Sequence, residues 1–113
     1  MRIRQRNPER NGDGSAAREE VVVVTGASAG VGRATALAFG RRGARVGLLA
    51  RGRDGLEAAR REIEAMGAHA LVVPTDVSDA NAVEAAAEQV ERELGPIDVW
   101  VNNAMVTVLA PLS

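Results

Sequence analysis

Short apolar runs alternate along this chain with longer stretches in which apolar residues recur every three or four positions. The runs at residues 21–24, 45–50, 69–74 and 97–101 predict four strands, because each is brief and rich in apolar residues. The stretches at 31–42, 54–66 and 78–94 have the spacing of amphipathic helices. The order β-α-β-α-β-α-β predicts an α/β fold with a parallel sheet and right-handed crossovers.

The helical stretches also predict which side chains face the sheet. The expected inner faces are Val31, Ala34, Thr35, Ala38 and Phe39 in the first, Leu56, Ala59, Ile63 and Met66 in the second, and Val83, Ala87, Val90 and Leu94 in the third. Asp54 and Glu57 have the spacing of a capping box, and Ser78 is the expected cap of the third helix.

Three glycines, Gly26, Gly30 and Gly32, stand where the Val21–Val24 run meets the first helical stretch. Glycine permits a tight turn and a close approach of backbone to a ligand, and the helix that follows directs free N–H groups toward the turn. This arrangement favours a diphosphate site, with an ordinary tight turn as the alternative. A P-loop is excluded, because it requires a lysine and the sequence has none.

Composition narrows the classes of function. The chain has 113 residues, 46% of them hydrophobic, with a net charge of -1, which describes an ordinary soluble domain. Without cysteine it has neither disulfides nor thiolate metal ligands, and no metal site is expected. No apolar run approaches the roughly 18 residues that predict a membrane span. We therefore expect a cytoplasmic protein that does not bind membranes. Because only 2% of its residues are aromatic, little can stack on bases, and we expect no nucleic-acid binding.

The first 18 residues show no periodicity and contain breaker pairs such as Asn7-Pro8 and Asn11-Gly12. We expect a disordered tail at 1–18 and a folded domain at 19–113. A targeting peptide and a nucleic-acid-binding arm are alternatives, because this stretch is rich in arginine.

Three linked motifs carry a resemblance to a known family over about residues 20 to 113, and one of them is the Asp76-Val77 pair that closes the third strand. Thr25-Gly26-Ala27-Ser28-Ala29-Gly30-Val31-Gly32 resembles the glycine motif of the short-chain dehydrogenase/reductases, and Val101-Asn102-Asn103-Ala104-Met105 resembles their Asn-Asn-Ala-Gly motif, with Met105 in place of glycine. The resemblance implies a Rossmann-like doubly wound sheet with strand order 3-2-1-4, incomplete here. It also implies hydride transfer between NAD(P) and an alcohol or carbonyl compound.

The resemblance also implies which residues hold the cofactor. The diphosphate loop would use Gly26, Ser28, Gly30, Val31 and Gly32. Asp76 and Val77, which close the third strand, would meet the adenine, while Asn103 and Ala104 would pass the ribose and Asn102 would brace the sheet. As an alternative, Asp76 simply caps the turn before Ser78.

Arg51 bears on the choice of cofactor. In dinucleotide folds an acid at the end of the second strand accepts from the ribose of NAD, whereas an arginine pairs with the 2′-phosphate of NADP. Here Arg51 follows Ala50, and the nearest carboxylate in sequence is Asp54, already assigned to capping. NADP(H) rather than NAD(H) is therefore predicted, and Arg53 is a candidate second contact.

No catalytic residue can be named. The family uses a tyrosine and a lysine for proton transfer, and this sequence contains neither. We expect the cofactor-binding front part of an oxidoreductase, truncated before its catalytic residues, which as a complete protein takes a small-molecule substrate and forms a homo-oligomer. The alternatives are a non-catalytic nucleotide-binding or regulatory module, and a nucleic-acid-binding α/β protein.

Two further expectations concern the sheet edges. The strand order leaves residues 97–101, with Trp100, at an open edge prone to association. His69 begins the third strand, roughly 20 Å from the cofactor, at about 3.3 Å per residue, and so is not a catalytic base.

Overall fold

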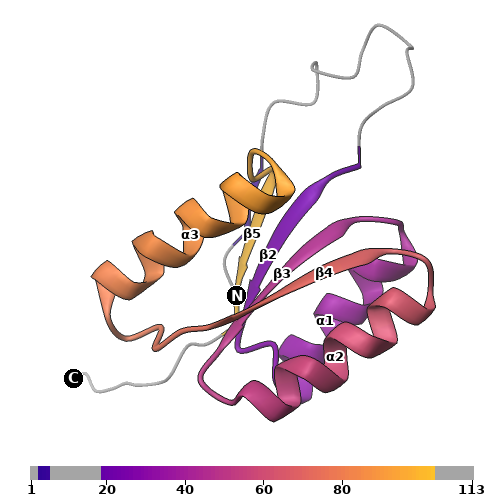
Figure 1. Cartoon of the computed structure of the whole chain (residues 1–113), viewed down its shortest axis with the longest axis horizontal. Helices are drawn as coiled ribbons and strands as arrows, with labels where there is room; N and C mark the ends of the chain where they lie inside the picture. Colours follow the sequence, from indigo (N-terminus) through magenta and orange to yellow (C-terminus); the bar gives the residue numbers. More distant parts are fainter. Residues whose placement is uncertain (1–2, 6–18, 104–113) are drawn as a thin grey trace, which may run out of the picture.

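The computed structural model describes residues 3–5 and 19–103 (Figure 1). The helices and strands alternate as the pattern predicts. They are β2 (Val21–Thr25), α1 (Gly30–Arg41), β3 (Arg45–Ala50), α2 (Arg53–Ala65), β4 (His69–Pro74), α3 (Ala80–Leu94) and β5 (Val99–Asn102), with a short additional strand, β1 (Ile3–Gln5), before them.

The sheet has the order β1-β5-β2-β3-β4. Strands β5, β2, β3 and β4 pair in parallel. Because β2 is the first of the four predicted strands, the order β4-β3-β2-β5 is the predicted order 3-2-1-4. β5 starts two residues later than expected, at Val99. Asp98, just before it, is bonded to β2: its carboxylate accepts from the Val21 N–H, and its own N–H donates to the Val21 carbonyl.

The expected open edge at β5 is wrong. β1 pairs with β5 in antiparallel register, with Ile3 opposite Val101 and Gln5 opposite Val99. The backbone groups that would template association therefore have partners along this strand. The three-residue strand was not predicted, because it is too short to show a period and contains arginine and glutamine.

The helices form two layers. α1 and α2 cover one face of the sheet and α3 lies on the other, as Figure 1 shows. Because both faces are covered, all five residues of β2 are buried, as its four valines predict. One hydrophobic cluster lies under α1 and α2, and a second, smaller one lies under α3.

The predicted inner face of α1 is confirmed for Phe39, which packs against the core, and Thr35 is partly buried, but the rest of it is wrong. Its buried residues are Gly32, Ala36 and Gly40, whereas Val31 is 71% exposed and Ala34 and Ala38 are also exposed. These buried residues are small and lie four apart, which lets α1 pack closely against its neighbours. A Cβ on Gly40, for instance, would come within 3.1 Å of the Ile63 side chain. A hydrophobicity pattern overlooks such a face because glycine carries no apolar side chain.

The predicted helix caps are also wrong by one or two residues. α2 is capped by Gly52, so that Asp54 lies in its first turn, and Glu57 forms ion pairs with Arg53 and Arg60 in place of a capping box. Leu56, Ala59 and Ile63 are buried as predicted, but Met66 follows the helix and is 40% exposed.

In α3 the N-cap is Asp79, whose carboxylate accepts from the N–H groups of Asn81 and Ala82. Ser78 is not the cap because it bonds instead to Asp76. Of the predicted inner face Val90 is buried and Val83, Ala87 and Leu94 are partly buried, while Ala86 is a buried position that the pattern did not include.

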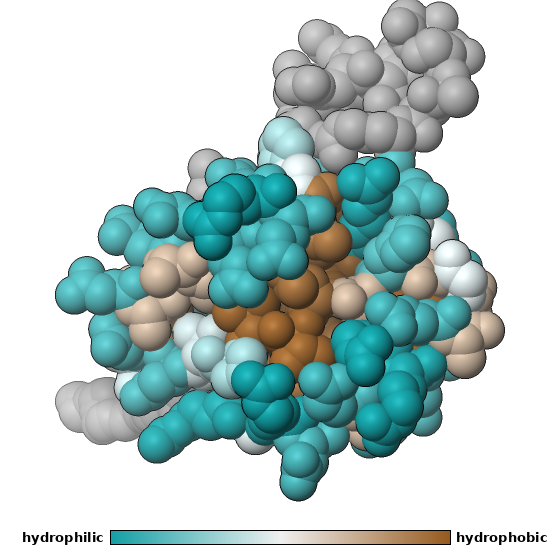
Figure 2. Space-filling model, in the orientation of Figure 1, coloured by the Kyte–Doolittle hydropathy of each residue, from teal (hydrophilic) through white to brown (hydrophobic). Residues whose placement is uncertain are grey.

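An apolar patch is visible on the molecular surface between α3 and β4 (Figure 2). The second cluster has partly buried hydrophobic side chains, namely Leu71, Leu94, Ile97 and Trp100. Trp100 is thus a core residue only in part. Within residues 3–5 and 19–103, no helix has the length and apolar character needed to cross a membrane.

Candidate functional site at the carboxyl ends of the strands

The parallel register brings the ends of four strands level. Thr25 lies opposite Leu49 and Asn102, and Ala50 lies opposite Pro74. The segments that follow these strands therefore emerge at one edge, here called the carboxyl edge. They contain Gly26 to Gly32, Arg51, Asp76 with Val77, and Asn103, so the predicted site residues that the structure describes share one side of the sheet. Ala104 and Met105 lie outside the described residues.

The glycine loop has a backbone that only glycine adopts readily. Gly26 and Gly30 have φ angles of 66° and 60°, in the left-handed region. A Cβ on Gly32 would overlap the carbonyl oxygen of Gly26 and lie 2.6 Å from its carbonyl carbon. The loop is also tied to the neighbouring strand, since the Ala27 N–H donates to the Leu49 carbonyl at 3.2 Å.

The amino end of α1 has no capping group from its own sequence. Its N-cap, Ala29, offers no side-chain hydrogen bond, and the first turn contains no acidic residue. α3, by contrast, is capped by Asp79, and α2 has Asp54 in its first turn. The first N–H groups of α1 and the positive end of its dipole thus face the glycine loop, which favours an anion. The exposed Val31 side chain borders this position.

A buried hydroxyl joins the ends of β2 and β5. The Thr25 hydroxyl donates to Oδ1 of Asn102 at 2.9 Å, and the backbone N–H of Asn103 donates to the same hydroxyl at 2.9 Å. Thr25 is only 2% exposed. Asn102 therefore braces the sheet, as the resemblance implies. Thr25 was not singled out by sequence reasoning, although a hydroxyl that closes a run of four valines signals a polar bond inside the sheet.

Asn103 contributes a buried donor. Its Nδ2 is inaccessible to solvent and has no hydrogen-bond partner within the described part of the chain. Buried polar atoms nearly always have a partner, so an orphaned amide at the carboxyl edge fits a site that receives an acceptor from a ligand.

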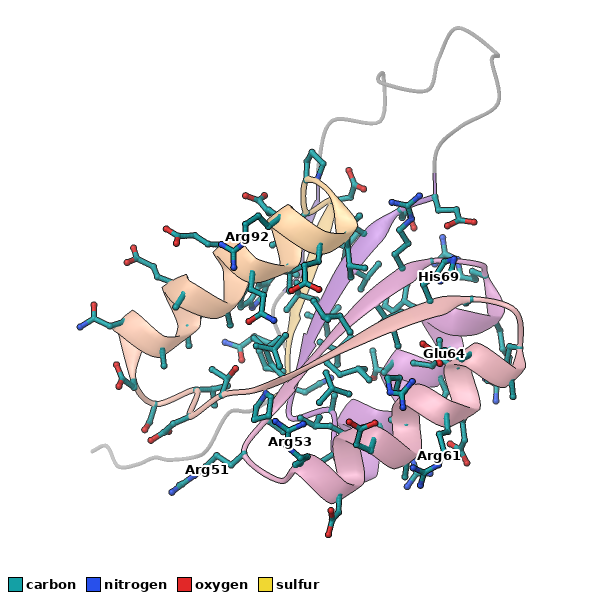
Figure 3. The ribbon with its side chains drawn as sticks, in the orientation of Figure 1. Arg51, Arg53, Arg61, Glu64, His69 and Arg92 are labelled. Carbon is teal, nitrogen blue, oxygen red and sulfur yellow. The ribbon has the colours of Figure 1, made fainter. Side chains whose placement is uncertain are left out.

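Arg51 provides an exposed cation at the same edge (Figure 3). No salt bridge among the described residues involves Arg51, whereas Arg53 lies 3.8 Å from Glu57. The guanidinium of Arg51 can therefore meet an anionic ligand without first breaking an ion pair within that part of the chain.

Asp76 lies close enough to Arg51 to interact with it. The pKa of Asp76 is lowered, first by the hydrogen bond from the Ser78 hydroxyl at 2.6 Å, next by the Ser78 N–H at 3.0 Å, and to a smaller degree by the Arg51 cation. The sequence identified only Asp54 as an acidic residue near Arg51, and the fold brings Asp76 near it as well. Both bonds reach Oδ1, so the turn that Asp76 caps leaves Oδ2 without a hydrogen bond from the described residues.

His69 lies at the opposite edge, as predicted. It is exposed at the first residue of β4 and borders a hollow of about 340 Å³, together with Arg45, Ala70, Leu71, Glu93 and Leu94. In the regions that the structure describes, no cluster of three or more His, Cys, Asp or Glu residues could hold a metal ion.

The comparisons with known proteins agree on one family. Residues 20–113 match the family model described as short chain dehydrogenase. Over 93 residues the chain is 41% identical to a short chain dehydrogenase of Pseudocercospora fijiensis, a match that covers 82% of this chain and 30% of that protein.

Solved structures give the same result. The L-sorbose reductase of Gluconobacter frateurii, in complex with NADPH and L-sorbose, superposes with a TM-score of 0.75 and 37% identity over 83% of this chain and 36% of that one. A metagenomic short-chain oxidoreductase in complex with NADP superposes with a TM-score of 0.73 and 47% identity, over 77% of this chain and 39% of that one. The chain thus spans about a third of the length of each of these three proteins.

Proposed function

Because this chain belongs to the short-chain dehydrogenase/reductase family, we propose that it is the NADP(H)-binding part of an oxidoreductase. When bound, the nicotinamide of such a cofactor gives or accepts a hydride, with an alcohol or carbonyl compound as the other reactant. Since the 113 residues contain neither tyrosine nor lysine, the role proposed for them is to bind and orient the cofactor.

The observation that carries this proposal is the uncapped amino end of α1 above the glycine loop. A diphosphate would accept from the first N–H groups of α1, and the absence of a Cβ at Gly32 keeps the loop close to the helix. Ser28 and Gly30 would line the same position. The orphaned Nδ2 of Asn103 supports the proposal independently, because a ribose hydroxyl could accept from it.

The preference for NADP(H) is argued from Arg51. A guanidinium without an ion pair among the described residues suits the 2′-phosphate, with which it can form two charge-assisted hydrogen bonds. Asp76 stays ionised at neutral pH, and its Oδ2 can accept from the adenine amine. Val77 would pack beside the ring.

The test is a titration of the 113-residue chain with NADPH and with NADH, followed by quenching of Trp100, its only tryptophan. We expect NADPH to bind more tightly. Arg51→Ala should weaken NADPH binding about 10- to 150-fold, the equivalent of roughly 1.5–3 kcal/mol for hydrogen bonds to a charged group, and leave NADH binding unchanged.

The matched control is Arg61→Ala. Arg61 is an exposed arginine of α2, the helix that follows Arg51, and lies about 12 Å beyond Arg53 at 1.5 Å per residue, so its removal changes the net charge equally without touching the carboxyl edge. An equal loss for both cofactors in Arg51→Ala would refute the assignment of Arg51. If the unaltered chain binds neither cofactor, the proposed function is wrong.

A second candidate is a dinucleotide-binding module without chemistry of its own. Both candidates bind cofactor, and turnover separates them. NADPH oxidation in the presence of a carbonyl compound, measured on the protein as isolated from its natural source, would support the oxidoreductase and exclude the module.

A further inference from the structure

We propose that Gly55, in the first turns of α2, is a positioning residue that sets the distance between the glycine loop and the start of α2. This inference rests on the proposed function for its effect on the cofactor. A Cβ on Gly55 would lie 2.7 Å from the carbonyl oxygen of Ser28, 2.8 Å from its Cβ and 3.2 Å from its Cα. The first two distances are shorter than real Cβ atoms show and the third is unusually tight, so a side chain at residue 55 requires the loop or the helix to move.

α2 cannot readily move away from the loop. Leu56, Ala59 and Ile63 are buried between the helix and the sheet. The helix is also held against α1, because Glu62 pairs with Arg33 at 2.9 Å, and Ile63 packs where Gly40 has no side chain.

The loop itself has little freedom to adjust. The Ser28 carbonyl oxygen and Cα belong to the backbone and the Ser28 Cβ is fixed to it, so a change of side-chain rotamer moves none of the three atoms aside. The preceding residue, Ala27, is buried and bonded to β3 through its N–H. Ser28 is therefore the part that a Cβ at residue 55 would displace.

The consequence reaches the proposed diphosphate position. Ser28 lies between Gly26 and Gly30, in the segment that would contact the phosphates, whereas α2 begins directly after Arg51 and Gly52. The contact between Gly55 and Ser28 thus joins the loop that would hold the diphosphate to the segment that would read the ribose. Displacement of the loop should weaken both cofactors in equal proportion, because the diphosphate is common to them.

The test compares Gly55→Ala with Arg61→Ala in the 113-residue chain. Arg61 is an exposed residue of the same helix that lies away from the loop and from the carboxyl edge, which makes it the control. Alanine is the better helix former, so an unobstructed Gly→Ala change inside a helix raises the midpoint of thermal unfolding. We expect Gly55→Ala to lower that midpoint. At a temperature where both variants are folded, we expect it to weaken NADPH and NADH at least tenfold each, with less than a threefold change in Arg61→Ala.

If Gly55→Ala does not fold, the double variant Gly55→Ala/Ser28→Gly removes one of the colliding atoms, and its affinities are compared with those of Ser28→Gly alone. A raised midpoint with unchanged affinities in Gly55→Ala would overturn the inference. So would a loss confined to NADPH, which would mean that the start of α2 moves and the loop does not. Failure of the unaltered chain to bind either cofactor would overturn the proposed function instead, while the midpoints would still test the contact between Gly55 and Ser28.

Discussion

The hydroxyl of Thr25 offers the sharpest test of how the carboxyl edge is held together. Thr25→Val replaces the hydroxyl by a methyl group of nearly the same size, so no cavity forms, and valine suits a strand that already contains four valines. The change therefore removes the hydrogen bonds that link the Thr25 hydroxyl to Asn102 and Asn103, together with its longer bond, at 3.5 Å, to the Val101 carbonyl.

The magnitude follows from what the substitution leaves behind. The side-chain oxygen of Asn102 and the backbone N–H of Asn103 would both lose a partner at 2.9 Å, beside a site that is 2% exposed. A polar group left unsatisfied in such a place costs about 1–3 kcal/mol. Because both groups are only partly buried and water can reach them in part, we expect the free energy of unfolding to fall by roughly 2–4 kcal/mol.

The measurement is urea unfolding of the variant, with two controls. Thr35→Val removes a hydroxyl that donates to the Val31 carbonyl in an exposed hydrogen bond within α1. This change should alter the free energy of unfolding by less than about 0.5 kcal/mol. Thr25→Ser keeps the hydroxyl and should recover most of the loss. If Thr25→Val is as stable as Thr35→Val, the hydroxyl does not hold the two strands together and the reasoning fails.

Three further changes test other parts of the edge. Gly32→Val should abolish binding of both cofactors, because even its Cβ would overlap the Gly26 carbonyl, and unchanged affinity in a titration would contradict the phosphate site. Asp79→Ala should lower the free energy of unfolding by about 0.5–2 kcal/mol through loss of the α3 cap, while Asp79→Ser should lose much less. Ser78→Ala should destabilise the protein at neutral pH and progressively less as the pH falls. The Ser78 hydrogen bonds lower the pKa of Asp76 in the folded protein. Their contribution to stability is therefore present above the pKa that Asp76 has in the unfolded chain, and it is lost as the pH falls through the pKa that Asp76 has in the folded protein. A difference in urea midpoints that did not shrink in acid would exclude this hydrogen bond as its source.

Local patterns in the sequence determined the strands, the helices and the glycine loop. A run of four valines predicts a doubly buried strand, because β-branched side chains suit a pleated surface and leave no polar face. The loop was predictable because left-handed φ angles and a missing Cβ each require glycine at a particular position. Strand alternation then implied the sheet order, since parallel strands need right-handed crossovers.

Sequence patterns gave wrong helix caps and a partly wrong inner face where several residues of one stretch could cap the helix or face the sheet. Asp54 and Ser78 are sound capping residues, yet Gly52 and Asp79 are the caps, because the surrounding packing decides where a helix begins. Val31 is apolar but exposed, since α1 turns its small residues to the sheet. The open edge at β5 was mispredicted because its partner, β1, pairs with it from the other end of the chain.

Only the tertiary structure decided the contacts between residues far apart in sequence. The bond between Thr25 and Asn102 spans 77 positions, and the approach of Gly55 to Ser28 joins the first turn of α2 to the loop that follows β2. The influence of Arg51 on Asp76 likewise depends on β3 and β4 ending level. The period and propensity of a sequence report how each segment folds and which face it buries. They do not report the distance between two segments, which the packing of α1, α2 and the sheet sets only when they come together.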